Sequence, residues 1–170
     1  MFTIQAKVAQ SYQLAARQRA VFNFFTDLQN FPRHMSEIVR AVEIKKNGQS
    51  LWTIKIEISS SSALEVQLLL AATLSGEEQI SYIPVVEGDD HLAIYIDIAE
   101  EGGYTNINFA LELRLQRESS FDIHPLAGLL GERSINKLVQ RHAEDMIGEF
   151  VIKAQTQKEA KPATEKKKKK

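Results

Sequence analysis

The fold is decided by residues 130–153, which read LGERSINKLVQRHAEDMIGEFVIK. Six side chains recur there at steps of three and four residues, which places them on one face of a helix: Ile135, Leu138, Val139, His142, Met146 and Phe150. The opposite face carries polar side chains that belong in water: Arg133, Lys137, Gln140, Arg141, Glu144 and Asp145. The stretch predicts one long helix with a single buried stripe, and such a helix needs an apolar surface to pack on.

Strands earlier in the chain supply that surface. Residues 2–8, in a strand that could extend to Leu14, and a series of segments between residues 39 and 117 alternate apolar and polar side chains, as half-buried strands do. The expected inward positions are Trp52, Ile54, Ile56, Ile58, Leu64, Val66, Leu68, Leu70, Ala72, Ile80, Tyr82, Leu92, Ile94, Ile96, Ile98, Ile107, Phe109, Leu111, Leu113 and Leu115. Short turns such as Asn47-Gly48 and Gly102-Gly103 join the segments. The pattern therefore predicts an antiparallel meander of six strands after the first strand, with one packed face and one wet face.

Two short helices are expected between the first strand and the meander. In Arg17–Asp27 the apolar residues recur every three or four positions, and Asp27 is a residue type that favours a helix break. A second helical piece is expected over residues 32–38, because proline is tolerated in a first helical turn. Three phenylalanines in this region, Phe24, Phe25 and Phe31, either gate a cavity or pack the helices onto the sheet, and we expect packing.

The amino-acid composition excludes several classes of function. A chain of 170 residues with 44% hydrophobic and 25% charged residues is typical of one soluble globular domain. The absence of cysteine excludes disulfides, thiolate metal sites and a cysteine nucleophile. The four histidines show no ligand spacing, so no metal and no cofactor is expected. We find neither a signal peptide nor a membrane span, which makes the cytoplasm the expected compartment.

Charge is distributed unevenly along the chain. Residues 158–170 contain seven lysines and two glutamates, a charge of +5, and the whole chain carries −1, which leaves −6 for residues 1–157. An acidic body argues against nucleic-acid binding. We expect residues 1–156 to form the domain and residues 157–170 to be a disordered lysine-rich tail. Three roles are open for such a tail: weak contact with anionic membranes, with up to about 1 kcal/mol per lysine, weak binding of nucleic acid, or only keeping the protein in solution. The oligomeric state is left open.

The order of elements resembles the START-like superfamily, which also includes Bet v 1-like allergens, polyketide cyclases and coenzyme Q-binding proteins. The most similar stretch is Arg19-Ala-Val-Phe-Asn-Phe-Phe-Thr-Asp27 with the following residues 28–35, and Val42-Glu-Ile44 and Trp52-Thr-Ile54 resemble the next strands. The resemblance covers residues 2 to about 155. It implies an α+β helix-grip fold: a curved antiparallel sheet of about seven strands, two short helices, and a long C-terminal helix with a cavity beneath it.

The resemblance also implies a function, the binding or transport of a hydrophobic small molecule such as a lipid, an isoprenoid or a polyketide-like compound. The inward positions would then line the cavity, and the expected ligand-binding residues are Trp52, Ile54, Ile56, Leu68, Tyr82, Ile94, Ile96, Phe109, Leu111, Leu138, His142 and Met146. Two alternatives stay open. One is a cyclase or dehydratase that uses His142 or Tyr82 as acid–base, and the other is a protein-interaction module with a collapsed cavity.

The two polar members of this set also have simpler interpretations. His142 is expected to bond a neighbour or to lie at the edge of the stripe, and Tyr82 to reach water at the rim of the sheet. The expected inward positions of the strands contain no Asp, Glu or Arg, which favours a binder over an enzyme.

Overall fold

The computed structural model describes residues 1–60 and 62–156, and the tail expected at residues 157–170 lies outside them. Seven antiparallel strands form one sheet in the order β1-β7-β6-β5-β4-β3-β2. Their bounds are β1 Phe2–Leu14, β2 Val39–Ile44, β3 Gln49–Ser59, β4 Ser62–Ser75, β5 Gln79–Pro84, β6 His91–Glu101 and β7 Tyr104–Arg117. The expected meander of six strands after the first strand is confirmed.

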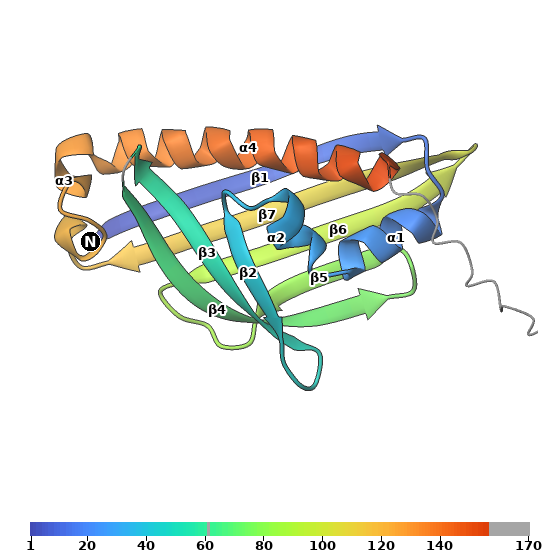
Figure 1. Cartoon of the computed structure of the whole chain (residues 1–170), viewed down its shortest axis with the longest axis horizontal. Helices are drawn as coiled ribbons and strands as arrows, with labels where there is room; N and C mark the ends of the chain where they lie inside the picture. The colour runs from blue at the N-terminus through green and yellow to red at the C-terminus, as the bar shows by residue number, and fades with distance from the viewer. Residues whose placement is uncertain (61, 157–170) are drawn as a thin grey trace, which may run out of the picture.

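Helices cover the concave side of this sheet and close its ends. Their bounds are α1 Gln18–Thr26, α2 Asn30–His34, the 3-10 turn η1 Ser120–Asp122, α3 Ala127–Leu130 and α4 Glu132–Thr156. Figure 1 shows α4 running along β1 and β7, with η1 and α3 at one end. Within the described part of the chain, no helix is both long enough and apolar enough to cross a membrane.

The expected strand register is confirmed at most positions. Nearly all inward side chains named from the sequence are buried or half-buried, and the Asn47-Gly48 turn has positive φ at both residues, 62° and 71°. Ala72 is an exception, because the last residues of β4 are exposed on both faces. Ile44 is exposed as well, at the end of β2, and a register shift between Val39 and Ala41 makes Val39 and Val42 the buried residues of this strand.

The rotation of α4 differs from the expected one. Leu138 is 49% exposed, and His142 lies at the edge of the buried face. The other four residues of the expected stripe are buried, namely Ile135, Val139, Met146 and Phe150, and the buried face also includes Ala143, Ile147, Val151 and Ala154. The physical reason is that the neighbouring face of α4, which includes Gln140, is turned toward the sheet and does not point into water.

That face of α4 hydrogen-bonds the free edge of β1. The Gln5 N–H donates to Asn136 Oδ1 at 2.9 Å, and Asn136 Nδ2 donates to the Thr3 carbonyl at 3.1 Å. Gln140 accepts from the Lys7 N–H and donates to the Lys7 carbonyl, both at 2.8 Å. β1 is an edge strand, so two side-chain amides of α4 take the place of the strand that would otherwise pair with it.

The short helices are anchored at the end of α1. Asn30 Nδ2 donates to the Phe24 carbonyl at 2.9 Å, and the Tyr82 hydroxyl donates to the Phe25 carbonyl at 2.7 Å. These bonds satisfy carbonyls that a helix end leaves free. Asp27 marks the break as expected, because its carboxylate accepts the Gln29 N–H at 3.2 Å.

The second short helix was placed wrongly by the sequence pattern. It was expected over residues 32–38 but spans Asn30–His34. Proline lies in its first turn, where the missing N–H is tolerated. The helix starts earlier because the N–H groups of Asn30 and Phe31 bond to the carbonyls of Asp27 and Leu28.

We expect loss of the edge amides to destabilise the fold. The double variant N136A/Q140A removes four hydrogen bonds to β1 and should lower the free energy of unfolding by about 1–3 kcal/mol in urea denaturation. Alanine raises helix propensity, so the measured loss understates the contribution of the bonds. The freed edge should also increase light scattering at high protein concentration. The matched control R133A/K137A alters exposed positions of the same helix and should change stability by less than about 0.5 kcal/mol; equal losses in both variants would contradict the assignment.

We expect Tyr82 to lower the free energy of unfolding at alkaline pH. Burial, with a smaller effect of Asp27, raises the pKa of the Tyr82 phenol above its ordinary value of 10.0. Because the folded state holds this proton more tightly, the associated stability is fully present below pH 10 and is lost as the pH rises further. Y82F should cost about 1–3 kcal/mol at neutral pH by leaving the Phe25 carbonyl without its donor. Its unfolding free energy should then fall less steeply in alkali than that of the wild type, while Y95F, an exposed control, should follow the wild type in both respects.

Candidate functional site

One half of the space between the sheet and α4 is filled by aromatic rings. Phe150 of α4 is at the centre of this cluster, with its ring centroid 4.9 Å from that of Phe31, 5.2 Å from Phe24 and 5.6 Å from Phe25. The cluster as a whole contains Phe24, Phe25, Phe31, Trp52, Tyr82, Phe109 and Phe150, none of them more than 2% exposed. The phenylalanines therefore pack the short helices onto the sheet, as expected, and this half leaves no room for a ligand.

The other half holds a small cavity beneath the first half of α4. It has a volume of about 20 Å³ and is lined by Ile38, Lys55, Ile56, Glu57, Leu92, Leu111, Leu113, Leu138, Val139, His142 and Ala143. That volume holds about one water molecule, whereas pockets for drug-sized ligands have roughly 300–1,000 Å³. The interior is thus a closed apolar space that a ligand would have to enlarge.

A polar contact lies at the rim of this cavity. His142 Nε2 of α4 hydrogen-bonds a carboxylate oxygen of Glu37, which lies just before β2, and the two side chains are 31% and 58% exposed. On β3, Lys55 Nζ is 3.8 Å from a Glu57 carboxylate oxygen. The expectation that His142 bonds a neighbour at the edge of the stripe is confirmed, and the contact joins α4 to the side of the sheet that contains β2 and β3.

The structure distributes the twelve expected ligand-binding residues over three environments. Four line the cavity, namely Ile56, Leu111, Leu138 and His142. Three are in the aromatic cluster, namely Trp52, Tyr82 and Phe109. Five pack elsewhere in the core or against it, namely Ile54, Leu68, Ile94, Ile96 and Met146. Their role toward a ligand stays a prediction.

Several cavity residues were not among the twelve expected ligand-binding residues. Leu92 and Leu113 were expected to face inward, and in the structure they line this cavity. Val139 belongs to the expected stripe of α4, and Ala143 follows it four residues later, so a stripe centred on Ile135 and Val139 would have included Ala143. Ile38 precedes β2 in a connection where no period applies.

The interior offers little acid–base chemistry. The Tyr82 hydroxyl is buried and committed to the Phe25 carbonyl, and burial raises the pKa of this phenol. The expectation that Tyr82 reaches water at the sheet rim is therefore wrong. His142 with Glu37 is an acid–base pair, but it lies at the rim and not against the aromatic cluster. Among residues 1–60 and 62–156, no group of three His, Asp or Glu side chains is placed to hold a metal ion.

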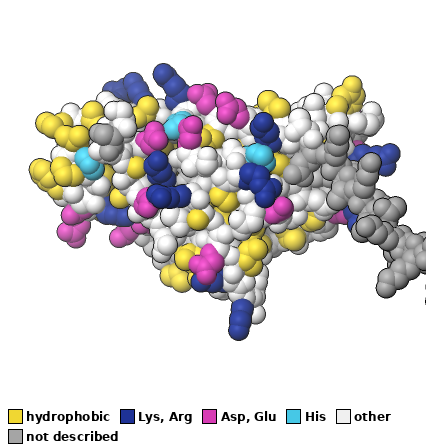
Figure 2. All heavy atoms as spheres, viewed as in Figure 1, with side chains coloured by type: hydrophobic (Ala, Val, Ile, Leu, Met, Phe, Trp, Pro, Cys, Tyr) yellow, Lys and Arg dark blue, Asp and Glu magenta, His cyan; other side chains and the backbone are white. Residues whose placement is uncertain are grey.

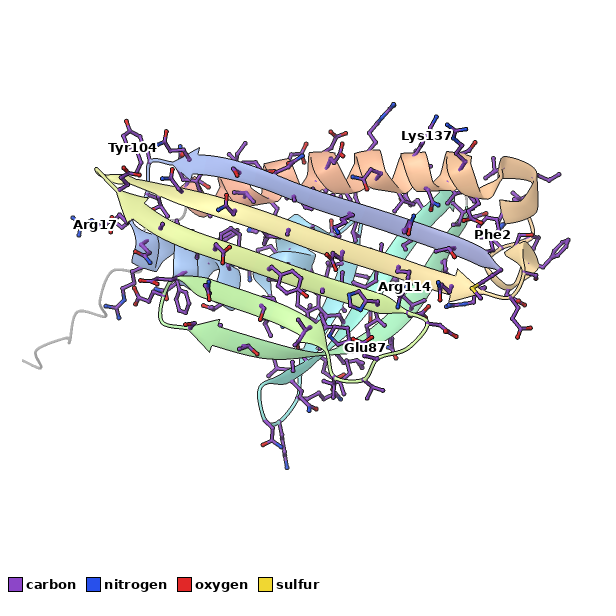
Figure 3. All side chains as sticks on the ribbon, turned by 180° about the vertical axis from the view of Figure 1, so that it is seen from behind. Phe2, Arg17, Glu87, Tyr104, Arg114 and Lys137 are labelled. Carbon is purple, nitrogen blue, oxygen red and sulfur yellow. The ribbon has the colours of Figure 1, made fainter. Side chains whose placement is uncertain are left out.

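A larger depression, about 850 Å³, lies outside the grip between β1, β7, the β5–β6 connection and the start of α4. Figure 3 labels three residues of its lining, Glu87, Arg114 and Lys137. Charged groups within it pair with one another, since Glu112 lies 3.6 Å from Lys7 Nζ and 3.9 Å from His91 Nε2. This depression is open to solvent and cannot exclude water from an apolar molecule, so the interior is the better candidate for a hydrophobic ligand.

Comparison with known proteins supports the architecture. No protein-family model matches the chain, and no curated protein matches it. Among solved structures, it is similar to the Zhui aromatase/cyclase from Streptomyces sp. R1128, with a TM-score of 0.62, 12% identity, and coverage of 88% of this chain and 93% of that one. It is also similar to a START superfamily protein from Mycobacterium smegmatis, with a TM-score of 0.53, 12% identity, and coverage of 83% and 93%. Ara h 8.0201 gives a TM-score of 0.51 at 8% identity, with coverage of 90% and 99%.

Identities this low bear on the fold alone. In this chain the fold consists of a seven-stranded antiparallel sheet and the long C-terminal helix α4 packed on it. The expected fold class is confirmed: the chain has the helix-grip fold of the START/Bet v 1 type.

Proposed function

We propose that the protein binds a hydrophobic small molecule in the interior between the sheet and α4. The observation that carries the proposal is the cavity itself, because eight of its eleven lining residues are aliphatic and the other three, Lys55, Glu57 and His142, are half-buried residues of β3 and α4. A space of this composition removes apolar surface from water, which stabilises a bound apolar molecule by about 25 cal/mol per Å². The lipid, isoprenoid or polyketide-like nature of the ligand is part of the proposal.

Binding on this scheme requires the interior to open. The cavity of about 20 Å³ must grow by more than tenfold to reach the lower end of ligand pockets. The amides of Asn136 and Gln140 hold one side of α4 to β1. On the other side, the exposed pair His142–Glu37 and the small side chain of Ala143 offer less resistance. The side of α4 facing β3 is therefore the side that moves.

A second candidate function is a protein-interaction module with a permanently closed interior. The observation that favours it is again the volume of about 20 Å³, which excludes any ligand from the conformation described. In this case the aliphatic residues around the cavity are core, and each contributes about 1.5–3 kcal/mol to folding without a ligand.

Paired substitutions at the cavity separate the two candidates. V139A enlarges the cavity and should strengthen uptake of the dye 1-anilinonaphthalene-8-sulfonate, whereas A143L fills it and should weaken uptake by about tenfold. A9L, at an exposed alanine of β1, is the control and should behave as the wild type. Thermal unfolding of each variant checks that the fold is intact.

Native mass spectrometry of freshly purified protein, followed by organic extraction, completes the test. A co-purified apolar molecule that is lost in A143L would support the binder. If no ligand is found, and if neither V139A nor A143L changes dye binding, the proposed binding function is rejected in favour of the protein-interaction module.

A further inference from the structure

An exposed apolar surface lies at one end of the molecule and is not part of the interior. Five large apolar side chains form it, and we call them the apolar tip: Met1 (86% exposed), Phe121 (75%), Leu126 (40%), Leu129 (84%) and Leu130 (43%). Figure 1 places η1, α3 and the N-terminus together at this end, and Figure 2 shows hydrophobic side chains gathered there. Clustered exposure of this kind marks an interaction surface.

The backbone that carries the apolar tip is anchored by buried residues. Ile123 and Ala127 anchor it, since they are buried while their neighbours point outward. Gly128 approaches Ser120 so closely that a Cβ there would lie 2.9 Å from Ser120 Oγ. The side chains of the tip are thus held outward by a packed turn.

The backbone of this segment satisfies most of its own hydrogen bonds. The N–H groups of Ile123 and His124 bond to the Ser120 carbonyl, and those of Leu129 and Leu130 bond to the Leu126 carbonyl. The Leu126 N–H donates to His124 Nδ1 at 3.0 Å. Free backbone groups find few partners where a segment meets lipid chains, so the internal hydrogen bonds of this segment lower the cost of such a contact.

The size and charge of the tip argue against other occupants. A stable interface between two proteins takes about 20–30 residues from each side, far more than five side chains on a convex end supply. The charged side chains beside the tip are of both signs, since Glu118, Asp122 and Glu132 stand against Arg133 and Lys137, and their sum of −1 gives no attraction for an anionic partner. An apolar partner without a required charge fits these properties best.

We propose that the apolar tip inserts into the surface of a lipid bilayer. After Met1, Leu129 and Phe121 are the most exposed side chains of the tip, and they would enter the boundary between headgroups and acyl chains, as the apolar side of interfacial helices does. The contact depends on apolar area and not on charge. This proposal is independent of a ligand in the interior.

Sedimentation of the full-length chain with phosphatidylcholine vesicles tests the proposal. These vesicles carry no net charge, so they remove any attraction of the seven lysines in residues 158–170 for anionic lipid. We expect the wild type to sediment with the vesicles at low and at high salt alike. F121S and L129S should each weaken binding by about tenfold or more.

Two exposed apolar residues elsewhere give matched controls. L74S on β4 and I152S on α4 change side chains that are 51% and 54% exposed, and both variants should bind as the wild type does. Failure of the wild type to sediment, or equal losses in the controls, would overturn the proposal. So would a wild-type dimer in size-exclusion chromatography with light scattering that F121S converts to monomer without any vesicle binding, because the tip would then join two copies of the chain.

Discussion

The arrangement of the grip depends on the hydrogen bonds between α4 and the free edge of β1. Residues four apart on a helix are separated by about 6 Å along its axis, and residues two apart on a strand by about 6.6–6.8 Å. Asn136 and Gln140 therefore meet Gln5 and Lys7 in turn along one line. The match fixes both the position and the rotation of α4, and it leaves Ile135, Val139 and Ala143 facing inward.

The consequence is an asymmetric grip. On the β1 side, α4 is held by directional bonds to backbone that cannot shift without breaking the sheet. On the β3 side, the cavity separates α4 from the sheet, and the hydrogen bond from His142 to Glu37 lies in partial contact with water. Exposed ion pairs contribute about 0–1 kcal/mol. Opening at the β3 side is therefore the less costly motion, and the aromatic cluster around Phe150 anchors the C-terminal half of the helix while it occurs.

The strands and their inward positions could be predicted from the sequence because alternation is a local property, and tertiary packing rarely overrides it in long strands. The rotation of α4 could not be predicted from the sequence. Amphipathic periodicity assigns Gln140 to water, yet its amide bonds Lys7 of β1, and Leu138 is displaced toward solvent as a result. The depth of Tyr82 was missed for a similar reason, since its partner is a backbone carbonyl 57 residues away in sequence. The volume of the cavity depends on how all these side chains pack against one another. A local sequence pattern carries no information on that packing, so the volume could not be predicted.

The closed interior and the apolar tip are linked through the free energy that is needed to open the interior. Moving α4 away from β3 exposes aliphatic side chains at the rim, such as Leu138 and Val139, at a cost of about 25 cal/mol per Å² in water. α4 begins two residues after Leu130 of the tip, and Leu138 lies about 9 Å along α4 from its first residue, Glu132, given 1.5 Å of rise per residue. Against a bilayer, the same side chains would meet an apolar medium, and much of the cost would disappear. A surface that binds the open form better than the closed form shifts the equilibrium toward opening by its difference in affinity, so contact at the tip would favour uptake at the rim even though neither site touches the other.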